Sequence, residues 1–424
     1  MRLLRILEVG GNGIVGVQNP GPVSRVVGDL ANEFAAMGHD VTVADSRADA
    51  PRVGLRDDVR MVELDLDCRL PITLRRTRVE RWKNHRPNRR YDRAFADELE
   101  RALNLSQFDI IHTHMPLAPL GRMFSAVCSE KHVHTCHTAT WADITRYKGA
   151  RGAYRHLRLL IGKWTRSNEL GFMSHTSLNV GLGSFLGLAL ERLSPDTLSR
   201  IPLTCIPNGI NLELWQPMDT VSARQHLGLE TDDFVVVMVG RLEPTKGHKY
   251  LIEAVRSVSR QIPGLRVFMI GRTDSEQYLR EMKSLSVGLP IRWCGHTSRD
   301  ELVQLISAAD VSVVTSEFDT QPTVVLESLA LGVPVLASDV GAVAEMISPD
   351  VGFLVERGDS AEIGRVLVEL SMKPESRARY QAAARPYVES AFSWRREAQL
   401  YINAFESLLG QREMSLAEVE PTWT

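Results

Sequence analysis

The 424-residue chain is poor in cysteine: it has five, scattered, and no two of them form a C-x-x-C pair. This usage is typical of reduced thiols in a cytoplasmic protein and argues against disulfides. Neither sign of charge is in surplus, and a net charge of -2 excludes a generally basic nucleic-acid binder. The N-terminal apolar stretch meets Gly10 too soon for the core of a signal peptide, so we expect none.

One hydrophobic run is long enough to cross a bilayer. Residues 170–190 carry no charged side chain except that of His175. They also include Asn179, several hydroxyl side chains and four glycines, which make membrane insertion unfavourable. We therefore predict a buried strand and helix here. The whole chain, with 44 % apolar and 24 % charged residues, has the composition of a soluble globular protein.

Short apolar runs alternate with amphipathic stretches throughout, which predicts an α/β fold with parallel sheets. Expected strands cover residues 3–9, 41–44, 59–64, 110–113, 132–136 and 171–174, with a helix at 23–37. A second set covers residues 234–239, 265–270, 291–294, 311–314 and 333–336, with a helix at 246–260. Residues 202–217, with three prolines, are the expected join between two doubly wound domains. Such domains bind ligands at the carboxyl ends of their strands.

The most informative stretch is residues 319–332, which follows an expected strand and opens a helix. Pro322 suits a first helical turn, and the amides of Thr323 and Val324 then face outward at the positive end of the helix dipole. Asp319 precedes this phosphate seat, and Glu327 lies one turn inside it. Two carboxylates around a phosphate site predict the binding of a sugar nucleotide.

Further motifs follow one another along the chain: Gly21-Pro-Val-Ser-Arg-Val-Val, Gly38-His-Asp-Val-Thr-Val, Asp109-Ile-Ile-His-Thr-His, Thr135-Cys-His137, Pro207-Asn-Gly-Ile, Gly240-Arg-Leu-Glu-Pro-Thr-Lys-Gly and Gly332-Val-Pro-Val. With these motifs and the acidic stretch, the chain resembles the family 4 glycosyltransferases, retaining enzymes of the GT-B fold, over nearly its whole length. The family signature is a pair of glutamates separated by seven residues. Here the second is Glu327, but the first position holds Asp319, and Glu317 lies two residues out of register.

The resemblance implies two Rossmann-like domains that face each other across a cleft, and it implies roles for individual residues. Arg241 and Lys246 would clamp the donor diphosphate, Asp319 would contact the donor sugar, and His137 would support the reacting sugar. Fixed cations there stabilise the charge that develops on the leaving phosphate. A plainer reading pairs both cations with Glu243. The implied nucleotide-sugar-binding set is Gly21, Arg241, Lys246, Gln321, Thr323, Val324 and Glu327, the last of them at the ribose.

Two patterns suggest a metal but are not predicted to bind one. An H-x-H pair on a strand presents both rings on one face, and the chain has two such pairs, 112/114 and 132/134. Their spacing matches no standard zinc pattern, and no acid or cysteine completes the set, so we read them as hydrogen-bonded strand-end histidines. Asp65-Leu-Asp67 resembles a metal motif of another glycosyltransferase fold. No metal and no cofactor is expected.

The resemblance divides the chain into an acceptor-binding domain at 1–205, a nucleotide-sugar-binding domain at 206–392, a terminal helix at 393–412 that returns to the first domain, and a disordered tail at 413–424. Residues Arg69 to Arg93 hold ten basic and two acidic side chains. This stretch is either a solvated loop or a patch that binds an anionic membrane surface, supported by residues 146–166. Both readings stay open, and the expected location is cytoplasmic, with or without peripheral contact to the inner face of the cell membrane.

The function that these features favour is retaining transfer of a sugar from a nucleotide diphospho-sugar to a hydroxyl acceptor, either lipid-linked or a polysaccharide or glycoconjugate precursor. Two alternatives use the same architecture: a sugar-nucleotide epimerase, and a non-catalytic partner subunit. A nicotinamide enzyme is a minor alternative, since Gly10-Gly-Asn-Gly lacks the dinucleotide spacing and only Asp45 resembles the acid that follows it.

Overall fold

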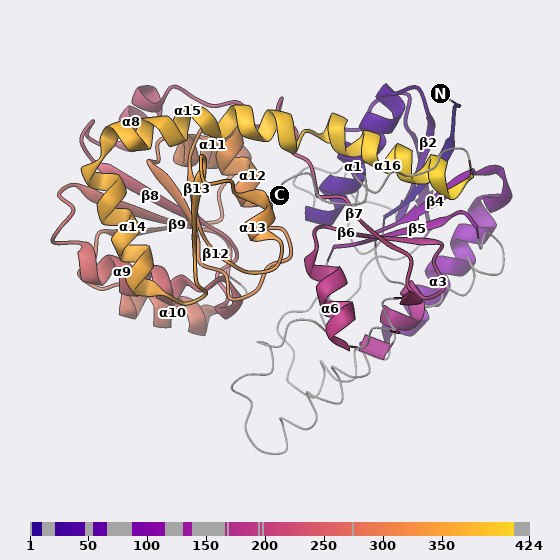
Figure 1. The fold of residues 1–424 in the computed structure, drawn as a ribbon, viewed down its shortest axis with the longest axis horizontal. Coiled ribbons are helices and arrows are strands. Elements are labelled where there is room, and N and C mark those ends of the chain that lie inside the picture. Colours follow the sequence, from indigo (N-terminus) through magenta and orange to yellow (C-terminus); the bar gives the residue numbers. More distant parts are fainter. Residues whose placement is uncertain are drawn as a thin grey trace, which may run out of the picture. The chain divides into compact units, whose positions relative to one another are not determined.

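The computed structural model describes residues 2–10, 22–46, 54–65, 87–114, 130–137, 166–167, 169–193, 196, 199–273 and 275–410. They belong to two compact units. The first comprises Met1–Asn208 with Trp394–Thr424, and the second comprises Gly209–Ser393. Figure 1 shows a sheet with helices in each unit.

The first unit contains a parallel sheet of seven described strands in the order β3-β2-β1-β4-β5-β6-β7. Glu8 of β1 lies opposite His112 of β4 in the register of these two central strands. The chain order reverses between β1 and β4, which is the topological switch point of the sheet. The strands are β1 (Arg5–Val9), β2 (Asp40–Ser46), β3 (Arg60–Leu64), β4 (Ile110–Thr113), β5 (His132–Cys136), β6 (Leu178–Gly181) and β7 (Leu203–Cys205).

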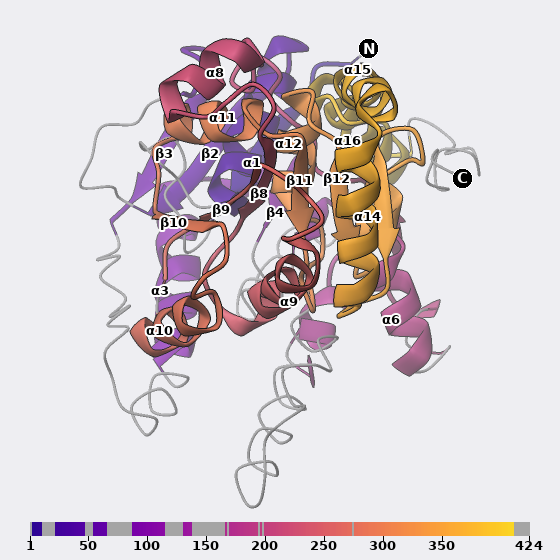
Figure 2. The same ribbon diagram turned by 90° about the vertical axis from the view of Figure 1, so that its left-hand side faces the viewer.

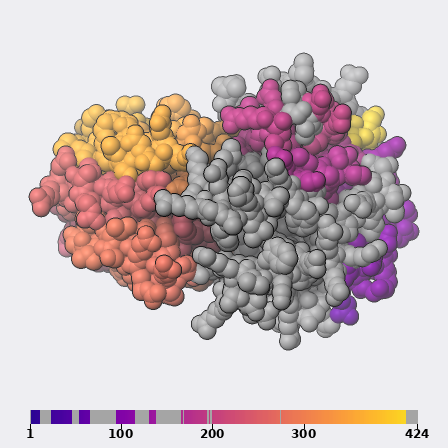
Figure 3. Space-filling model, turned by 90° about the horizontal axis from the view of Figure 1, so that it is seen from below, coloured from indigo at the N-terminus to yellow at the C-terminus, as the bar shows by residue number. Residues whose placement is uncertain are grey.

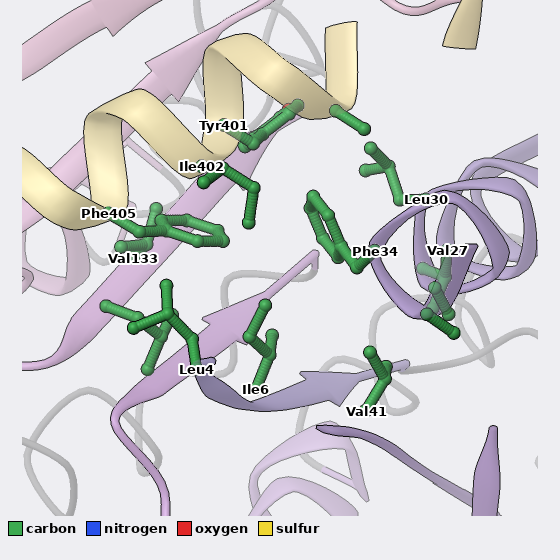
Figure 4. Close-up of a cluster of buried hydrophobic side chains, with 14 of the residues drawn as sticks. Leu4, Ile6, Val27, Leu30, Phe34, Val41, Val133, Tyr401, Ile402 and Phe405 are labelled. Atoms are coloured by element: carbon green, nitrogen blue, oxygen red, sulfur yellow. The ribbon is translucent and has the colours of Figure 1, made fainter. Parts of the chain in front are cut away.

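Helices cover both faces of this sheet, because the side chains of β1 alternate between two apolar cores. Ile6 packs with Phe34 of α1 (Pro22–Ala36) and Phe405 of α16 (Trp394–Leu408), as Figure 4 shows. Leu7 packs instead with Phe95 of α3 (Pro87–Ala102). A smaller cluster lies under α6 (Phe185–Leu193). The terminal helix α16 thus completes the core of the first unit.

The second unit contains a parallel sheet of six described strands in the order β10-β9-β8-β11-β12-β13. Its strands are short and apolar, as expected for a parallel sheet that is buried on both faces. The chain order reverses between β8 and β11. The strands are β8 (Phe234–Val239), β9 (Leu265–Ile270), β10 (Ile291–Gly295), β11 (Val311–Val314), β12 (Val335–Ser338) and β13 (Gly352–Val355).

Helices also lie on both sides of the second sheet, which Figures 1 and 2 show from two directions. On one side are α9 (His248–Val258), α10 (Glu276–Leu285) and α14 (Ser360–Met372), whose surface is seen from below in Figure 3. The other side carries α11 (Arg299–Ser307), α12 (Thr323–Ala330) and the short α13 (Val343–Met346). α8 (Thr220–Leu227) packs on α11, and α15 (Pro374–Ala391) packs on α12.

These two parallel sheets confirm the predicted α/β class. One predicted strand is wrong: residues 169–173 are helical, and Ser174 N donates to Leu170 O at 2.9 Å, the i to i−4 bond of a helix. The strand of this region begins later, at Leu178. The prediction missed β7 and β13, which have three and four residues. Among the helices described here, none combines the length and apolarity that crossing a bilayer requires.

Candidate functional site

The switch point of the second sheet brings two loops together at the carboxyl ends of adjacent strands. The loop after β8 carries Arg241 and Lys246, and the loop after β11 carries Asp319. Main-chain and side-chain bonds join the two loops: Glu317 N donates to Thr245 O at 2.7 Å, and Thr315 Oγ1 donates to Gly247 O at 3.0 Å. Ligands of doubly wound sheets bind at such a point.

A cation from one loop meets an acid from the other. Lys246 Nζ lies 2.5 Å from Asp319 Oδ2, with both side chains largely buried. Ser316 Oγ donates to the same carboxylate oxygen at 3.3 Å. Arg241 Nη2 lies 2.9 Å from Glu243 Oε1 and is about half exposed. The Arg241–Glu243 pair of the plainer reading is thus present, while Lys246 pairs with Asp319 instead of Glu243.

Glu317 does not take the position of the missing first glutamate. Its Oε1 accepts a hydrogen bond from Tyr250 OH at 2.8 Å and pairs with Lys249 Nζ at 3.1 Å. Burial alone would raise the pKa of Glu317, but the bonds from Tyr250 and Lys249 together outweigh it and lower the pKa. Asp319 is thus the acid that faces Lys246.

Helix α12 begins directly after this loop, with Pro322 at its N-cap. Val325 N donates to Pro322 O at 3.0 Å, which closes the first turn. The amides of Thr323 and Val324 come before this bond, where a helix has no acceptor of its own to offer. Glu327 is buried one turn further on. The helix therefore presents two amides and the positive end of its dipole at the end of the loop that carries Asp319.

Two glycines permit the close packing of these loops. Gly341 has φ +59°, and a Cβ atom built on it would lie 1.8 Å from Asp319 O. Gly247 has φ +69°, and its Cβ would lie 1.9 Å from Thr315 O. Both backbone conformations favour glycine, and any side chain would push the loop of Asp319 or of Lys246 away.

In the first unit, His137 belongs to a buried hydrogen-bonded network at the switch point. His137 Nε2 lies 3.0 Å from His114 Nδ1, and His114 Nε2 lies 2.7 Å from Glu8 Oε2. Glu8 Oε1 lies 2.9 Å from His112 Nδ1. His112 Nε2 contacts Thr135 Oγ1 at 2.7 Å, and this hydroxyl contacts Tyr401 OH of α16 at 2.9 Å.

Successive residues of a strand face opposite sides of the sheet, so the other histidines form a separate network. His132 Nε2 and His134 Nδ1 contact Thr113 Oγ1 at 2.9 and 3.1 Å. Phe172 packs edge-on against both rings. Burial lowers the pKa of His132 to about 3 and that of His134 well below its usual value. These two rings are neutral core histidines.

Glu8 corrects one prediction. We expected no acid to complete the H-x-H pair, but the carboxylate of Glu8 contacts both rings, and its ligand atoms and theirs lie within 4.8 Å of one another. This donor set is chemically suited to a metal ion such as zinc. Each nitrogen–oxygen contact, however, is at hydrogen-bond distance, so bonds within the protein already account for the arrangement. No sequence motif marks Glu8, because only strand pairing brings it to His112 from a distant position in the chain.

Comparison with known proteins relates both units to glycosyltransferases. The family described as "Glycosyltransferase Family 4" matches residues 21–214, and "Glycosyl transferases group 1" matches residues 219–386. The D-inositol 3-phosphate glycosyltransferase of Saccharomonospora viridis is 30 % identical over 325 residues, which cover 74 % of this chain and 73 % of the relative.

The chain belongs to the family 4 glycosyltransferases. A second relative of the transferase is the GDP-mannose-dependent monoacylated alpha-(1-6)-phosphatidylinositol monomannoside mannosyltransferase of Corynebacterium glutamicum, 27 % identical over 51 % of this chain and 56 % of the relative. Sucrose-phosphate synthase from Thermosynechococcus elongatus has the same fold, with a TM-score of 0.75 and 21 % identity over 96 % of this chain and all of that one. These relationships confirm the GT-B fold.

Of the site residues predicted for the transferase, Arg241, Lys246, Asp319, Gln321, Thr323, Val324 and Glu327 all lie in the two loops and the helix at the switch point of the second sheet. His137 lies at the end of β5 in the first unit. Gly21 falls outside the residues that the structure describes, as do residues 69–86 of the basic stretch and residues 138–165.

Proposed function

We propose that this transferase moves a hexosyl group from a nucleotide diphospho-sugar to a hydroxyl acceptor, with retention of the anomeric configuration. The observation that carries the proposal is the Lys246–Asp319 ion pair at the switch point of the second sheet, in the loop that leads into the first turn of α12. A cation beside free helical amides suits a diphosphate, and the adjacent acid suits a sugar joined to it.

Each predicted residue then has a chemical task. Lys246 and Arg241 hold the diphosphate with the amides of Thr323 and Val324, and Glu327 accepts bonds from the ribose hydroxyls. For Arg241 to act, its guanidinium must turn from Glu243 toward the phosphate, which its exposed position allows. These groups stabilise the charge that develops on the leaving diphosphate.

The sugar is held on its other sides. Asp319 accepts bonds from its hydroxyls, and Gln321 lines the donor site beside it. Gly21 lets the first loop approach the donor phosphate, and His137 supports the reacting face of the sugar. The bond from the anomeric carbon to the phosphate oxygen breaks while a bond to the acceptor oxygen forms on the same face. The leaving phosphate oxygen takes the acceptor proton, so the protein contributes mainly positioning and electrostatics. No metal or other cofactor is needed in this scheme.

The acceptor proposal draws on the relatives, whose names include an inositol phosphate and a phosphatidylinositol mannoside. We infer an acceptor hydroxyl on a phosphorylated or lipid-linked molecule, or on a polysaccharide precursor. The basic stretch from Arg69 to Arg93 would then hold an anionic head group at the inner surface of the cell membrane. Charge reversal of Arg75, Arg76 and Arg78 should abolish salt-sensitive binding to anionic vesicles, and unchanged binding would remove this part of the proposal.

Thermal stabilisation by UDP-, GDP- and ADP-sugars tests the donor class, because a ligand that binds only the folded protein raises its melting temperature. The donor that stabilises is then incubated with candidate acceptors, and NMR of the product gives its anomeric configuration. Turnover that requires an acceptor and retains the configuration supports the proposal. Acceptor-independent conversion of the donor would indicate an epimerase, and an inverted product would exclude the front-face reaction.

A further inference from the structure

The hydrogen bonds that link His137, His114, Glu8 and His112 have defined donors and acceptors, which follow from the atoms in contact. Both oxygens of Glu8 are buried and each faces one ring nitrogen, of His112 at 2.9 Å and of His114 at 2.7 Å. A carboxylate only accepts hydrogen bonds, so both nitrogens that face it must carry protons. His114 therefore donates from Nε2. In a neutral imidazole the other nitrogen is then an acceptor, which for His114 is Nδ1.

The contact between His114 and His137 then determines which nitrogen of His137 carries the proton. His114 Nδ1 lies 3.0 Å from His137 Nε2, and the two rings are stacked with centroids 5.3 Å apart. Because Nδ1 of His114 accepts, Nε2 of His137 must donate. The remaining nitrogen of His137, Nδ1, is left as a hydrogen-bond acceptor. No other hydrogen bond of His137 is found within the described part of the chain.

We propose that Glu8 and His114 are positioning residues that hold His137 as its Nε2–H tautomer, so that Nδ1 accepts a hydrogen bond from a hydroxyl of the reacting sugar. The inference rests on the proposed function for the role of His137, but the tautomer itself follows from contacts inside the first unit. It assigns a purpose to an acid and a histidine that sequence reading left out of the site.

The charge states agree with this direction. Burial raises the pKa of Glu8, but the two histidines outweigh it and bring the pKa to about 2, so the group is a carboxylate at neutral pH. Burial lowers the pKa of His114 to about 4, which keeps that ring neutral. Burial and the neighbouring rings of His114, His134 and His112 also lower the pKa of His137 well below its usual value.

The hydrogen bonds of His112, Thr135 and Tyr401 keep the carboxylate of Glu8 in place. His112 donates to the second oxygen of Glu8. The series of hydrogen bonds continues through Thr135 Oγ1 to Tyr401 OH, which is buried on α16. Both carboxylate oxygens are thus occupied, and Glu8 cannot rotate without breaking a buried bond. A carboxylate that fixes the tautomer of a histidine by accepting its ring N–H is a common arrangement in metal and catalytic sites.

The direct test is the protonation of the ring nitrogens, read by long-range proton–nitrogen NMR of full-length protein labelled with ¹⁵N-histidine. The His137 signals are assigned by their loss in His137→Gln. We expect wild-type His137 to show a protonated Nε2 and an unprotonated Nδ1 at pH 7.5. A spectrum with the proton on Nδ1 would overturn the proposal, whatever the activity of the enzyme.

Variants of Glu8 test whether this carboxylate sets the tautomer of His137 through His114. Glu8→Gln has one acceptor and one donor, so it can no longer accept from both rings. We expect a fraction of His137 to shift its proton to Nδ1, and kcat to fall about 10- to 100-fold with a donor KM within about threefold of wild type. Glu8→Asp keeps two acceptor oxygens and should keep the Nε2–H tautomer. An unchanged tautomer and kcat in Glu8→Gln would contradict the relay.

Thr113→Val is the matched control, because it removes a buried hydrogen bond from β4 on the opposite face of the sheet. It should leave the His137 tautomer and kcat as in wild type. A fall in kcat equal to that of Glu8→Gln would show that Glu8 acts only through the stability of the fold. If His137→Gln retains full kcat, the proposed role of His137 in transfer fails, while the wild-type spectrum still decides the tautomer. The two failures are therefore distinguishable.

Discussion

The ammonium of Lys246 and the carboxylate of Asp319 come from separate loops and meet at 2.5 Å, across the switch point of the second sheet. Asp319 is one methylene shorter than the family's glutamate, yet it reaches Lys246. A bound diphosphate would have to share Lys246 with this acid. In the proposed donor site this pair would link recognition of the sugar to recognition of the phosphate, because both would use the same two side chains.

Removal of the Lys246 ammonium should slow the departure of the diphosphate leaving group. Lys246→Ala is expected to lower kcat/KM by about 100-fold or more, since one electrostatic contact to the developing charge is lost. Lys249→Ala is the matched control: Lys249 lies three residues along and pairs with Glu317 instead. Its activity should stay within about threefold of wild type. Steady-state kinetics with both variants decides the point, and equal effects would show that Lys246 has no special role.

The negative charge of Asp319 should matter more for turnover than the length of its side chain. Asp319→Asn loses the ion pair with Lys246 and is expected to lower kcat at least about tenfold. Asp319→Glu restores the residue type of the family signature, and we expect it to keep turnover while changing the preference among donor sugars that share one nucleotide. Competition between such donors measures this. An Asp319→Asn enzyme with wild-type kcat would remove Asp319 from the site.

Close packing at Gly341 should be needed for the donor site. Gly341→Ala places a Cβ against the carbonyl of Asp319 at a positive φ, so the loop must shift. We expect donor affinity to fall by about tenfold or more. Gly288→Ala has φ +76° but no atom within 4 Å of its Cβ, and so it carries the backbone strain without the contact. Calorimetry should show normal donor binding for Gly288→Ala, and equal losses would assign the effect to strain alone.

The buried histidines should make the first unit sensitive to acid. The pKa of His132 is about 3 in the folded protein against 6.5 for an unperturbed ring. Between these values the unfolded chain binds a proton that the folded chain does not, so stability falls as pH falls below 6.5 and is fully present above it. Each such ring contributes about 1.4 kcal/mol per pH unit.

Hydrogen exchange of the amides of β4 and β5, corrected for intrinsic rates, measures this between pH 5 and 7.5. His132→Gln should flatten the slope by close to one proton while the remaining buried rings keep part of it. If the opening free energy of these strands were independent of pH in this window, the assignment of neutral buried rings would be wrong.

Much of the fold followed from the sequence, because parallel strands buried on both faces appear as short apolar runs. β4, β5 and β8 were predicted with the bounds that the structure gives. The error at 171–174 arose because Phe172 and Met173 look like a strand, although they occupy a helical turn and belong to different apolar clusters. β7, with three residues, is too short to give a periodic signal.

The site was predictable in part for a similar reason. Lys246 and Asp319 follow strands and lie in motifs with fixed spacing, so order along the chain was enough to place them. Their mutual ion pair was not predicted, because it depends on how two loops approach. Glu8 was missed entirely: its neighbour His112 is 104 residues away in sequence, and only the pairing of β1 with β4 brings the two together.

The most direct measurement of the central claim is calorimetric titration of the wild-type enzyme and of Glu327→Gln with the nucleotide sugar that stabilises the protein best. Glu327 is buried one turn inside α12, where we place the ribose. We expect saturable one-site binding to wild type, at least about tenfold weaker binding to Glu327→Gln, and an unchanged affinity for Lys249→Ala. Equal affinities for wild type and Glu327→Gln, at matched melting temperatures, would contradict this claim.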